Sequence, residues 1–372
     1  MKSAHTNGSS LNESETGRTL VIGSSGFIGR FITEACLESG RPTYVLVRSS
    51  SNSPSTKATT IKFLQDKGAI IIYGSITNQE FMEKVLRGYK IEVVISAVGG
   101  ESILDQFTLV EAIKNVHTVK RFLPSEFGHD IDRAEPVEPG LTMYEQKRKV
   151  RREIEKCGIP YSYICCNSIA AWPYHDNTHP ADVLPPLDRF QIYGDGTVKA
   201  YFVAGSDIGK FTVMSINDER TLNKTVHFQP PSNLLNMNEI ASLWETKIGR
   251  MLPRVTVAEE DLLQRAQVLS ANPIGTNPPE MRIPQSVVAA ITHDIFINGC
   301  QINFSMDKPT DVEVCSLYPD ATFQTIAECF DDFAKKIFGN AKAVSKPVTT
   351  SNNDICETAA KPEALAITAI CT

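Results

Sequence analysis

The first third of the chain alternates short apolar runs with longer amphipathic stretches. Four continuous apolar runs stand in order at residues 20–22, 44–47, 70–73 and 93–96. Apolar runs without polar alternation are typical of buried parallel strands, because helices cover both faces of such a sheet. Between the first two runs, residues 27–38 place apolar side chains at helical spacing. This alternation predicts right-handed strand-helix-strand units in a Rossmann-type, doubly wound parallel sheet.

The pattern continues for two more strands and then becomes irregular. The apolar runs 119–123 and 161–166 predict a fifth and a sixth strand. Residues 173–186 are rich in Pro, His and Asp, which is typical of a loop rather than a core element. Residues 322–338 return to a helical stripe of large apolar side chains, and Gly339 is placed to end that helix.

These patterns predict four segments and an α/β fold class. We expect a flexible N-terminus over residues 1–17 and an NADP-binding Rossmann domain over 18–170, to which later segments can return. A smaller C-terminal α+β substrate lobe is expected over 171–339, and a flexible tail over 340–372.

Composition narrows the class of protein. The chain has 372 residues, of which 42% are hydrophobic and 22% charged, as in an ordinary globular enzyme. A net charge of -6 without a basic face argues against a nucleic-acid partner. No run approaches the roughly 18 apolar residues that a membrane span needs, and the N-terminus lacks the apolar stretch of a signal peptide. Nine scattered cysteines without a CxxC pair predict reduced thiols. We therefore expect a cytoplasmic monomer or weak homodimer.

A glycine-rich turn joins the first predicted strand to the first predicted helix. It consists of Gly23, Ser24, Ser25, Gly26, Phe27, Ile28 and Gly29. In this pattern the first glycine permits a tight turn, the second lets the backbone approach a pyrophosphate, and the third lets helix and strand pack closely. The helix N-terminus then offers N–H groups to the phosphates. Such a turn can also be purely structural, but its place between strand and helix predicts a dinucleotide site.

The end of the second strand indicates which dinucleotide binds. NAD sites usually place an acidic residue there, which binds the ribose hydroxyls. This chain has Arg48 instead, followed by the serines 49–51 and then Lys57. A guanidinium, hydroxyls and an ammonium group suit a 2′-phosphate, which an acid would repel. The residues therefore favour NADPH, and the alternative is that Arg48 is a solvated surface charge.

Candidate catalytic groups follow the fifth strand. Ligands bind at the carboxyl edge of such sheets, so His129 is expected to face the cofactor. A basic helical run follows, in which Tyr144 stands three residues before Lys147 and Met143 stands four before it. The Tyr-x-x-x-Lys pair of ordinary short-chain dehydrogenases is therefore missing. An inward lysine can still do acid/base chemistry if burial lowers its pKa, although charge alone does not show which basic residue turns inward.

The chain resembles the plant isoflavone reductase-like group, an atypical branch of the short-chain dehydrogenase fold. The resemblance covers about residues 18–339 and includes three signatures of one subgroup, RFLP at 121–124, ICCN at 164–167 and THD at 292–294. The extended C-terminal tail is another feature of that subgroup. The resemblance implies reduction of a flavonoid substrate by NADPH, from a flavan-3,4-diol to a flavan-3-ol, through a quinone methide.

The resemblance also implies roles for individual residues. It identifies Lys147 as the catalytic lysine and His129 as a second acid/base group that contacts the substrate. The other implied contacts are Arg151, Cys166 and Asn167 for the cofactor, and Met143 and His293 for the substrate.

The residues alone leave other interpretations open. Cys165 and Cys166 are typical of buried core thiols, and His293 is typical of a hydrogen-bonded structural histidine. His175 and His179 have ligand-like spacing but lie in the proline-rich loop without a third ligand, so no metal site is predicted. The alternative activities are a sister reductase acting on a benzylic ether, lignan or isoflavone, and a non-catalytic NADP(H)-sensing regulator with the same fold.

Overall fold

The computed structural model describes most of the two predicted lobes. The described residues are 17–48, 55–170, 185, 187–271, 283–306 and 308–339. Residues 1–16 of the predicted N-terminal segment, the predicted tail, the serines 49–51, and most of the proline-rich loop with His175 and His179 lie outside the described residues.

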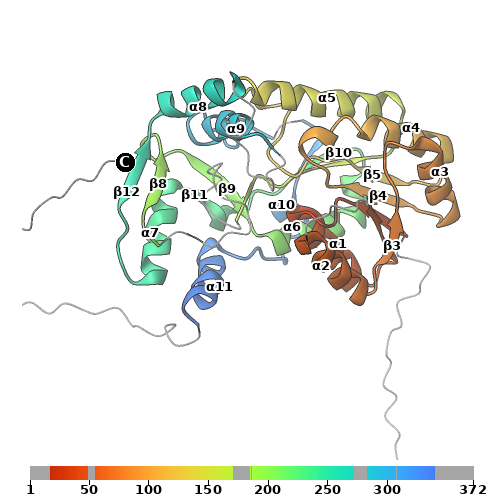
Figure 1. The fold of residues 1–372 in the computed structure, drawn as a ribbon, viewed down its shortest axis with the longest axis horizontal. Helices are drawn as coiled ribbons and strands as arrows, with labels where there is room; N and C mark the ends of the chain where they lie inside the picture. Colours follow the sequence, from red (N-terminus) through yellow and green to blue (C-terminus); the bar gives the residue numbers. More distant parts are fainter. Residues whose placement is uncertain are drawn as a thin grey trace, which may run out of the picture.

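A parallel five-stranded sheet forms the centre of the N-terminal lobe (Figure 1). Its strand order is β3-β2-β1-β4-β5. The chain therefore adds strands on one side of β1 and then on the other, as in a doubly wound sheet. The predicted Rossmann-type α/β fold is therefore confirmed. The strands are β1 (Thr19–Ile22), β2 (Thr43–Val47), β3 (Ile70–Tyr73), β4 (Val93–Ser96) and β5 (Arg121–Leu123). The first four match the predicted runs within one residue, whereas the fifth begins two residues later than predicted.

Helices cover both faces of this sheet. On one face, Leu20 and Ile22 of β1 belong to a core with the helices α3, α4 and α5, whereas Val21 faces a second core with α1 and α6. Successive side chains of one strand thus pack in two different cores, which explains the continuous apolar runs. The helices are α1 (Phe27–Glu38), α2 (Ser55–Asp66), α3 (Gln79–Gly88), α4 (Gln106–Val116), α5 (Gly140–Lys156) and α6 (Gly205–Ile216), with a 3-10 turn, η1 (Gly100–Ser102), before α4.

Later segments of the chain lie beside the N-terminal sheet. Strand β6 (Ser162–Cys165) pairs in parallel with β10 (Lys224–His227), which pairs with β13 (Asp311–Glu313). A parallel bridge between Phe122 and Tyr161 connects this small sheet to β5. The carboxyl ends of β5 and β6 therefore meet at the same edge.

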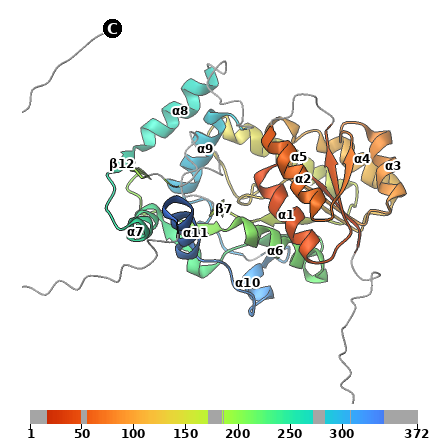
Figure 2. The same ribbon diagram turned by 60° about the horizontal axis from the view of Figure 1, so that its bottom comes forward.

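The remaining elements form a mixed α+β lobe with its own core around Trp244, Phe202 and Phe296. Figure 2 shows α7, α8, α9 and α11 gathered on the side away from α3 and α4. The strands are β7 (Ser168–Ile169), β8 (Phe190–Tyr193), β9 (Lys199–Val203), β11 (Leu234–Asn236) and β12 (Arg254–Val257). The helices of this lobe are α7 (Met237–Ile248), α8 (Glu259–Ala271), α9 (Gln285–Phe296) and α11 (Ile326–Phe338), with the 3-10 turn η3 (Pro231–Asn233). The short helix α10 (Val314–Leu317) instead packs in the core of Val21 beside α1 and α6, and the 3-10 turn η2 (Glu219–Thr221) lies against α6 and β10. Within the described part of the chain, none of the helices has both the length and the apolar character needed to cross a membrane.

The last helix is shorter than its apolar stripe predicts. Residues 322–338 were expected to be helical, but α11 begins at Ile326 because Thr325 caps it. The Thr325 hydroxyl accepts a bond from the backbone N–H of Glu328, and the Glu328 side chain accepts one from the N–H of Thr325. This reciprocal capping box fixes the first turn. Gly339 follows the helix with a φ of +69°, in agreement with its predicted place.

Candidate active site

The glycine-rich turn has the close backbone contacts that its pattern predicts. Gly23 adopts a φ of +90°, and a Cβ built on it would lie 2.5 Å from the carbonyl oxygen of Ala97 in the neighbouring strand-end loop. A Cβ on Gly29 would lie 2.2 Å from the carbonyl oxygen of Gly23. Gly26 occupies the N-cap of α1, where it offers no side chain to satisfy the first N–H groups. The turn therefore presents a bare helix N-terminus suited to a pyrophosphate.

Replacing Gly29 by Ala should destabilise this turn and weaken NADPH binding. The new methyl group would meet backbone atoms that cannot rotate away, and overpacking of this kind costs about 1–3 kcal/mol. The measurements are urea unfolding and a fluorescence titration with NADPH. Gly88→Ala is the matched control, since its Cβ would meet nothing within 4 Å at the end of α3. Equal behaviour of the two variants would argue against a role for the close contact of Gly29.

The two basic residues expected at the 2′-phosphate lie near the same sheet edge. Arg48 directly follows β2 and is exposed, and Lys57 lies half-buried in the first turn of α2. An exposed guanidinium at the end of the second strand is available to a ligand phosphate. The contact of either residue with the cofactor stays a prediction.

His129 is buried after β5 and pairs with Tyr144 of α5. The Tyr144 hydroxyl lies 2.5 Å from Nε2 of His129, and the two rings meet edge to face. Burial lowers the pKa of His129 to about 4, and the positive charge of Lys147 adds to this effect. Burial also raises the pKa of the Tyr144 hydroxyl well above its ordinary value. At neutral pH the pair is therefore an uncharged phenol and an uncharged imidazole.

Lys147 lies on the same face of α5 as Tyr144. Positions three apart on a helix are neighbours, so the tyrosine and the lysine both reach the loop after β5. The Lys147 Nζ donates a hydrogen bond of 2.9 Å to the backbone oxygen of Glu126. Burial lowers the pKa of Lys147, although the nearby carboxylate of Glu126 opposes the shift. The half-buried lysine thus has the environment that favours a neutral amine.

Arg151, one turn beyond Lys147, lies in a buried charge network. Its guanidinium is 1% exposed and binds both carboxylate oxygens of Glu126, at 3.0 and 2.9 Å. It also donates to Asp130 at 2.8 Å and to Asp132 at 3.0 Å. These bonds attach α5 to the loop that carries His129. The implied cofactor contact of Arg151 stays a prediction, and the observed partners support a positioning role.

The end of β6 lies against the loop after β5. The backbone N–H of Asn167 donates to the oxygen of Gly128 at 2.9 Å, and its side-chain amide donates to Phe228 at 2.8 Å. Asn167 adopts a φ of +59°, a conformation that asparagine tolerates better than most residues. Cys166 is fully buried, and burial raises the pKa of its thiol to about 12. Cys166 is therefore a neutral thiol, and its expected place beside the nicotinamide stays a prediction.

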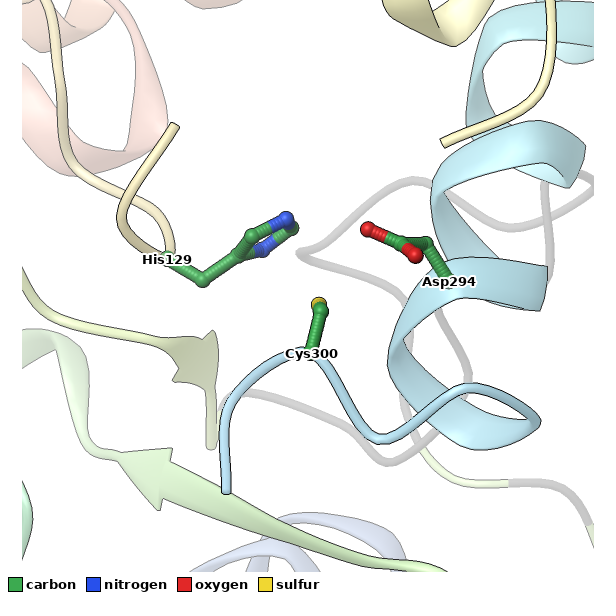
Figure 3. A group of neighbouring side chains, drawn as sticks. All are labelled: His129, Asp294 and Cys300. Carbon is green, nitrogen blue, oxygen red and sulfur yellow. The ribbon is translucent and has the colours of Figure 1, made fainter. Parts of the chain in front are cut away.

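The THD signature on α9 brings Asp294, rather than His293, toward His129. The His293 Nε2 lies 2.9 Å from the carboxylate of Glu259 on α8, so this histidine faces a neighbouring helix. Figure 3 shows Asp294 and Cys300 grouped with His129. Met143 packs between the two lobes' cores. The expected substrate contacts of Met143 and His293 stay predictions.

The comparison with known protein families matches most of this architecture. The model of the NmrA-like family matches residues 15–330, which include the glycine turn, the loop after β5, α5 and α9. The chain belongs to the NmrA-like family. Within this family it is similar to plant reductases. Leucoanthocyanidin reductase of Desmodium uncinatum is 59% identical over 320 residues, which cover 86% of this chain and 80% of that protein.

Two solved structures are also similar to this chain. The complex of leucoanthocyanidin reductase with NADPH from Vitis vinifera has a TM-score of 0.78 and 60% identity, covering 86% of this chain and 99% of that one. An isoflavone reductase structure has a TM-score of 0.72 and 37% identity over the same shares.

Two features of this NmrA-like site were missed at the level of sequence. The first is Tyr144, which stands three rather than four residues before Lys147 and therefore does not fit the Tyr-x-x-x-Lys pattern. The helical pattern itself contained the signal, because residues three apart share a face. The second is the approach of Asp294 and Cys300 to His129, for which the sequence separation offers no signal.

Proposed function

We propose that this chain is an NADPH-dependent leucoanthocyanidin reductase. It reduces a flavan-3,4-diol of leucocyanidin type to a 2,3-trans-flavan-3-ol of catechin type, as a step of flavonoid and proanthocyanidin biosynthesis. The observation that carries this proposal is the likeness to the leucoanthocyanidin reductases of Desmodium uncinatum and Vitis vinifera, each of which covers 86% of this chain at 59–60% identity. The glycine turn supports the dinucleotide, because a Cβ on Gly29 would fill the close contact beneath it.

The reaction requires loss of the C4 hydroxyl before reduction. Hydroxide is a poor leaving group, but a phenol on the A ring can expel it as water when the phenol loses its proton. The product of this step is a quinone methide, which is electrophilic at C4. Bound NADPH supplies the hydride, and its addition at C4 restores the aromatic ring. The substrate is therefore an aromatic compound whose phenol is conjugated to the leaving position.

Lys147 and His129 are suited to the two proton transfers of this dehydration, one away from the phenol and one to the departing C4 oxygen. We assign Lys147, as the neutral amine, to take the phenolic proton, and His129 to protonate the departing C4 oxygen. After the hydride has added, the phenolate takes its proton back from the Lys147 ammonium group, and His129 takes up a proton from solvent. Charging an imidazole with a pKa of about 4 costs about 4 kcal/mol at pH 7. The negative charge that develops on the phenol offsets part of this cost, and the same low pKa makes the imidazolium a strong acid. The hydroxyl of Tyr144 keeps the ring in position.

The remaining site residues fit supporting roles in this proposal. Arg48 and Lys57 would hold the 2′-phosphate of NADPH, and the turn from Gly23 to Gly29 would hold the pyrophosphate. Arg151 would hold the loop that carries His129 against α5 through its bonds to Glu126. The described cysteines are all free thiols, as in proteins of a reducing compartment such as the cytoplasm. A monomer or weak homodimer in the cytoplasm is part of the proposal.

A substrate panel tests the reaction class. Purified protein and NADPH are incubated in parallel with a flavan-3,4-diol, a pinoresinol-type lignan, a phenylcoumaran and an isoflavone. We expect a flavan-3-ol as the main product, formed together with NADP⁺. Preferred turnover of a lignan, ether or isoflavone would identify a sister reductase instead. Binding of NADPH without turnover of any substrate would favour a dinucleotide-sensing regulator.

A further inference from the structure

Three potential metal ligands from two distant parts of the chain meet beside the proposed active site. His129 follows β5, Asp294 lies on α9, and Cys300 lies in the loop after α9 (Figure 3). All three side chains are buried, and their ligand atoms lie within 4.8 Å of one another. In the figure the Asp294 carboxylate points toward the imidazole, and the Cys300 sulfur lies below both. One nitrogen, one oxygen and one sulfur ligand thus converge.

The Asp294 carboxylate lacks a partner for one of its oxygens. Its Oδ1 accepts a bond of 3.2 Å from the side-chain amide of Asn298. Its Oδ2 has no hydrogen-bond partner, and water does not reach it readily because the residue is only 3% exposed. A buried polar atom left unpaired costs about 1–3 kcal/mol, and more for a charged group. A positive charge placed between the three side chains would remove this cost.

We propose that His129, Asp294 and Cys300 bind a divalent transition-metal ion such as Zn²⁺, and that the bound ion inhibits the reductase. Imidazole, thiolate and carboxylate are the three ligand types that zinc accepts, whereas Mg²⁺ and Ca²⁺ prefer oxygen alone. Zinc bonds of about 2.0–2.3 Å place tetrahedral ligand atoms about 3.3–3.5 Å apart. The ligand atoms, which lie within 4.8 Å of one another, therefore have to approach by up to about 1.5 Å when the ion binds.

The protonation state of His129 suits metal binding directly. The low pKa of His129 keeps its imidazole neutral, which is the form that binds metals. The ion binds Nδ1, or binds Nε2 in place of the Tyr144 hydroxyl. The Cys300 thiol has a raised pKa because of burial and the charge of Asp294, so it gives up one proton as the metal–sulfur bond forms. Capture of His129 removes the group that protonates the leaving oxygen. The inhibition therefore rests on the proposed function, whereas the binding does not.

Metal binding by the full chain tests the site without any assay of activity. Co²⁺ serves as a spectroscopic probe, because a cobalt–thiolate bond gives a charge-transfer band in the near ultraviolet, and Zn²⁺ affinity is measured by calorimetry. We expect the band in the unmodified protein, its loss in Cys300→Ser, and a Zn²⁺ affinity at least tenfold weaker in both Cys300→Ser and Asp294→Asn. Near-ultraviolet circular dichroism checks that both variants are folded.

Cys157→Ser is the matched control, because Cys157 lies in a second, half-exposed group with Glu111 and Glu153. This variant should keep the band and the affinity. Loss of both in Cys157→Ser, with both retained in Cys300→Ser and Asp294→Asn, would overturn the proposal, as would the absence of any cobalt band. Zn²⁺ should also inhibit the reductase at least tenfold less in Cys300→Ser, with chelator restoring the rate. Failure of turnover altogether would contradict the proposed function but leave the binding result standing.

Discussion

Replacing Lys147 by Met should lower kcat about 10²–10⁴-fold, which is the usual contribution of a positioned acid/base group. NADPH binding should remain within a few-fold, since the amine reaches the Glu126 backbone rather than the glycine turn. The measurement is a steady-state assay with a flavan-3,4-diol together with a direct NADPH titration. Lys149→Met, an exposed substitution on the same helix, is the control and should retain the rate. Near-normal turnover of Lys147→Met with NADPH bound would remove Lys147 from the chemistry.

The pH dependence of the residual rate distinguishes the roles of the two groups. In the unmodified protein, kcat/KM should be flat between pH about 4 and the lowered pKa of Lys147. In this range the neutral lysine increases as the protonated His129 decreases, and the two effects cancel. In Lys147→Met only the decrease remains, so the residual kcat/KM should fall about tenfold per unit between about pH 5 and 8. A flat residual profile would show that neutral His129 is the active form and that the assignments are reversed.

Replacing Arg151 by Met should destabilise the fold by about 3–5 kcal/mol, because it leaves the buried carboxylates of Glu126 and Asp130 without their partner. Both carboxylates are almost fully buried beside the guanidinium. The neighbouring Arg152 is 57% exposed and pairs with Asp132 and Glu155 at the surface. Arg152→Met should therefore cost less than about 1 kcal/mol. Equal urea midpoints for the two variants would contradict the importance of the buried network.

The destabilised Arg151 variant should also lose activity, because the network joins α5 to the loop after β5. If Arg151 acted mainly through the cofactor, its replacement would cost more free energy of NADPH binding than free energy of unfolding. Comparison of the NADPH dissociation constant with the urea midpoint therefore separates the positioning role from the implied cofactor contact.

The sheet and the glycine turn were predictable because local signals determine them. Continuous apolar runs identify the central strands, since the side chains of each strand pack in cores on both faces of the sheet. The turn from Gly23 to Gly29 requires residues without a Cβ at fixed positions, and the structure has the close approaches that the pattern implies. The start of α11 was less predictable, because the capping box at Thr325 overrides a stripe that extends further toward the N-terminus.

The catalytic surroundings depended on contacts between distant segments. Charge alone did not show that Arg151 would be the buried member of the basic run, because its carboxylate partners lie some twenty residues earlier. The partner of His129 on α5 was visible in the helical spacing, but only once the position of the loop was known. The approach of Asp294 and Cys300 depends on how α9 packs across the lobes, and no local pattern encodes that packing.

Transfer of a label from the cofactor to the substrate tests the central claim most directly. The protein is incubated with a flavan-3,4-diol and NADPH that carries deuterium at the transferable C4 position, and the product is analysed by mass spectrometry and NMR. The proposed reaction predicts one deuterium per flavan-3-ol, located at C4, with the C4 oxygen lost as water. A product without deuterium, or one that retains the C4 oxygen, would contradict hydride transfer to a quinone methide.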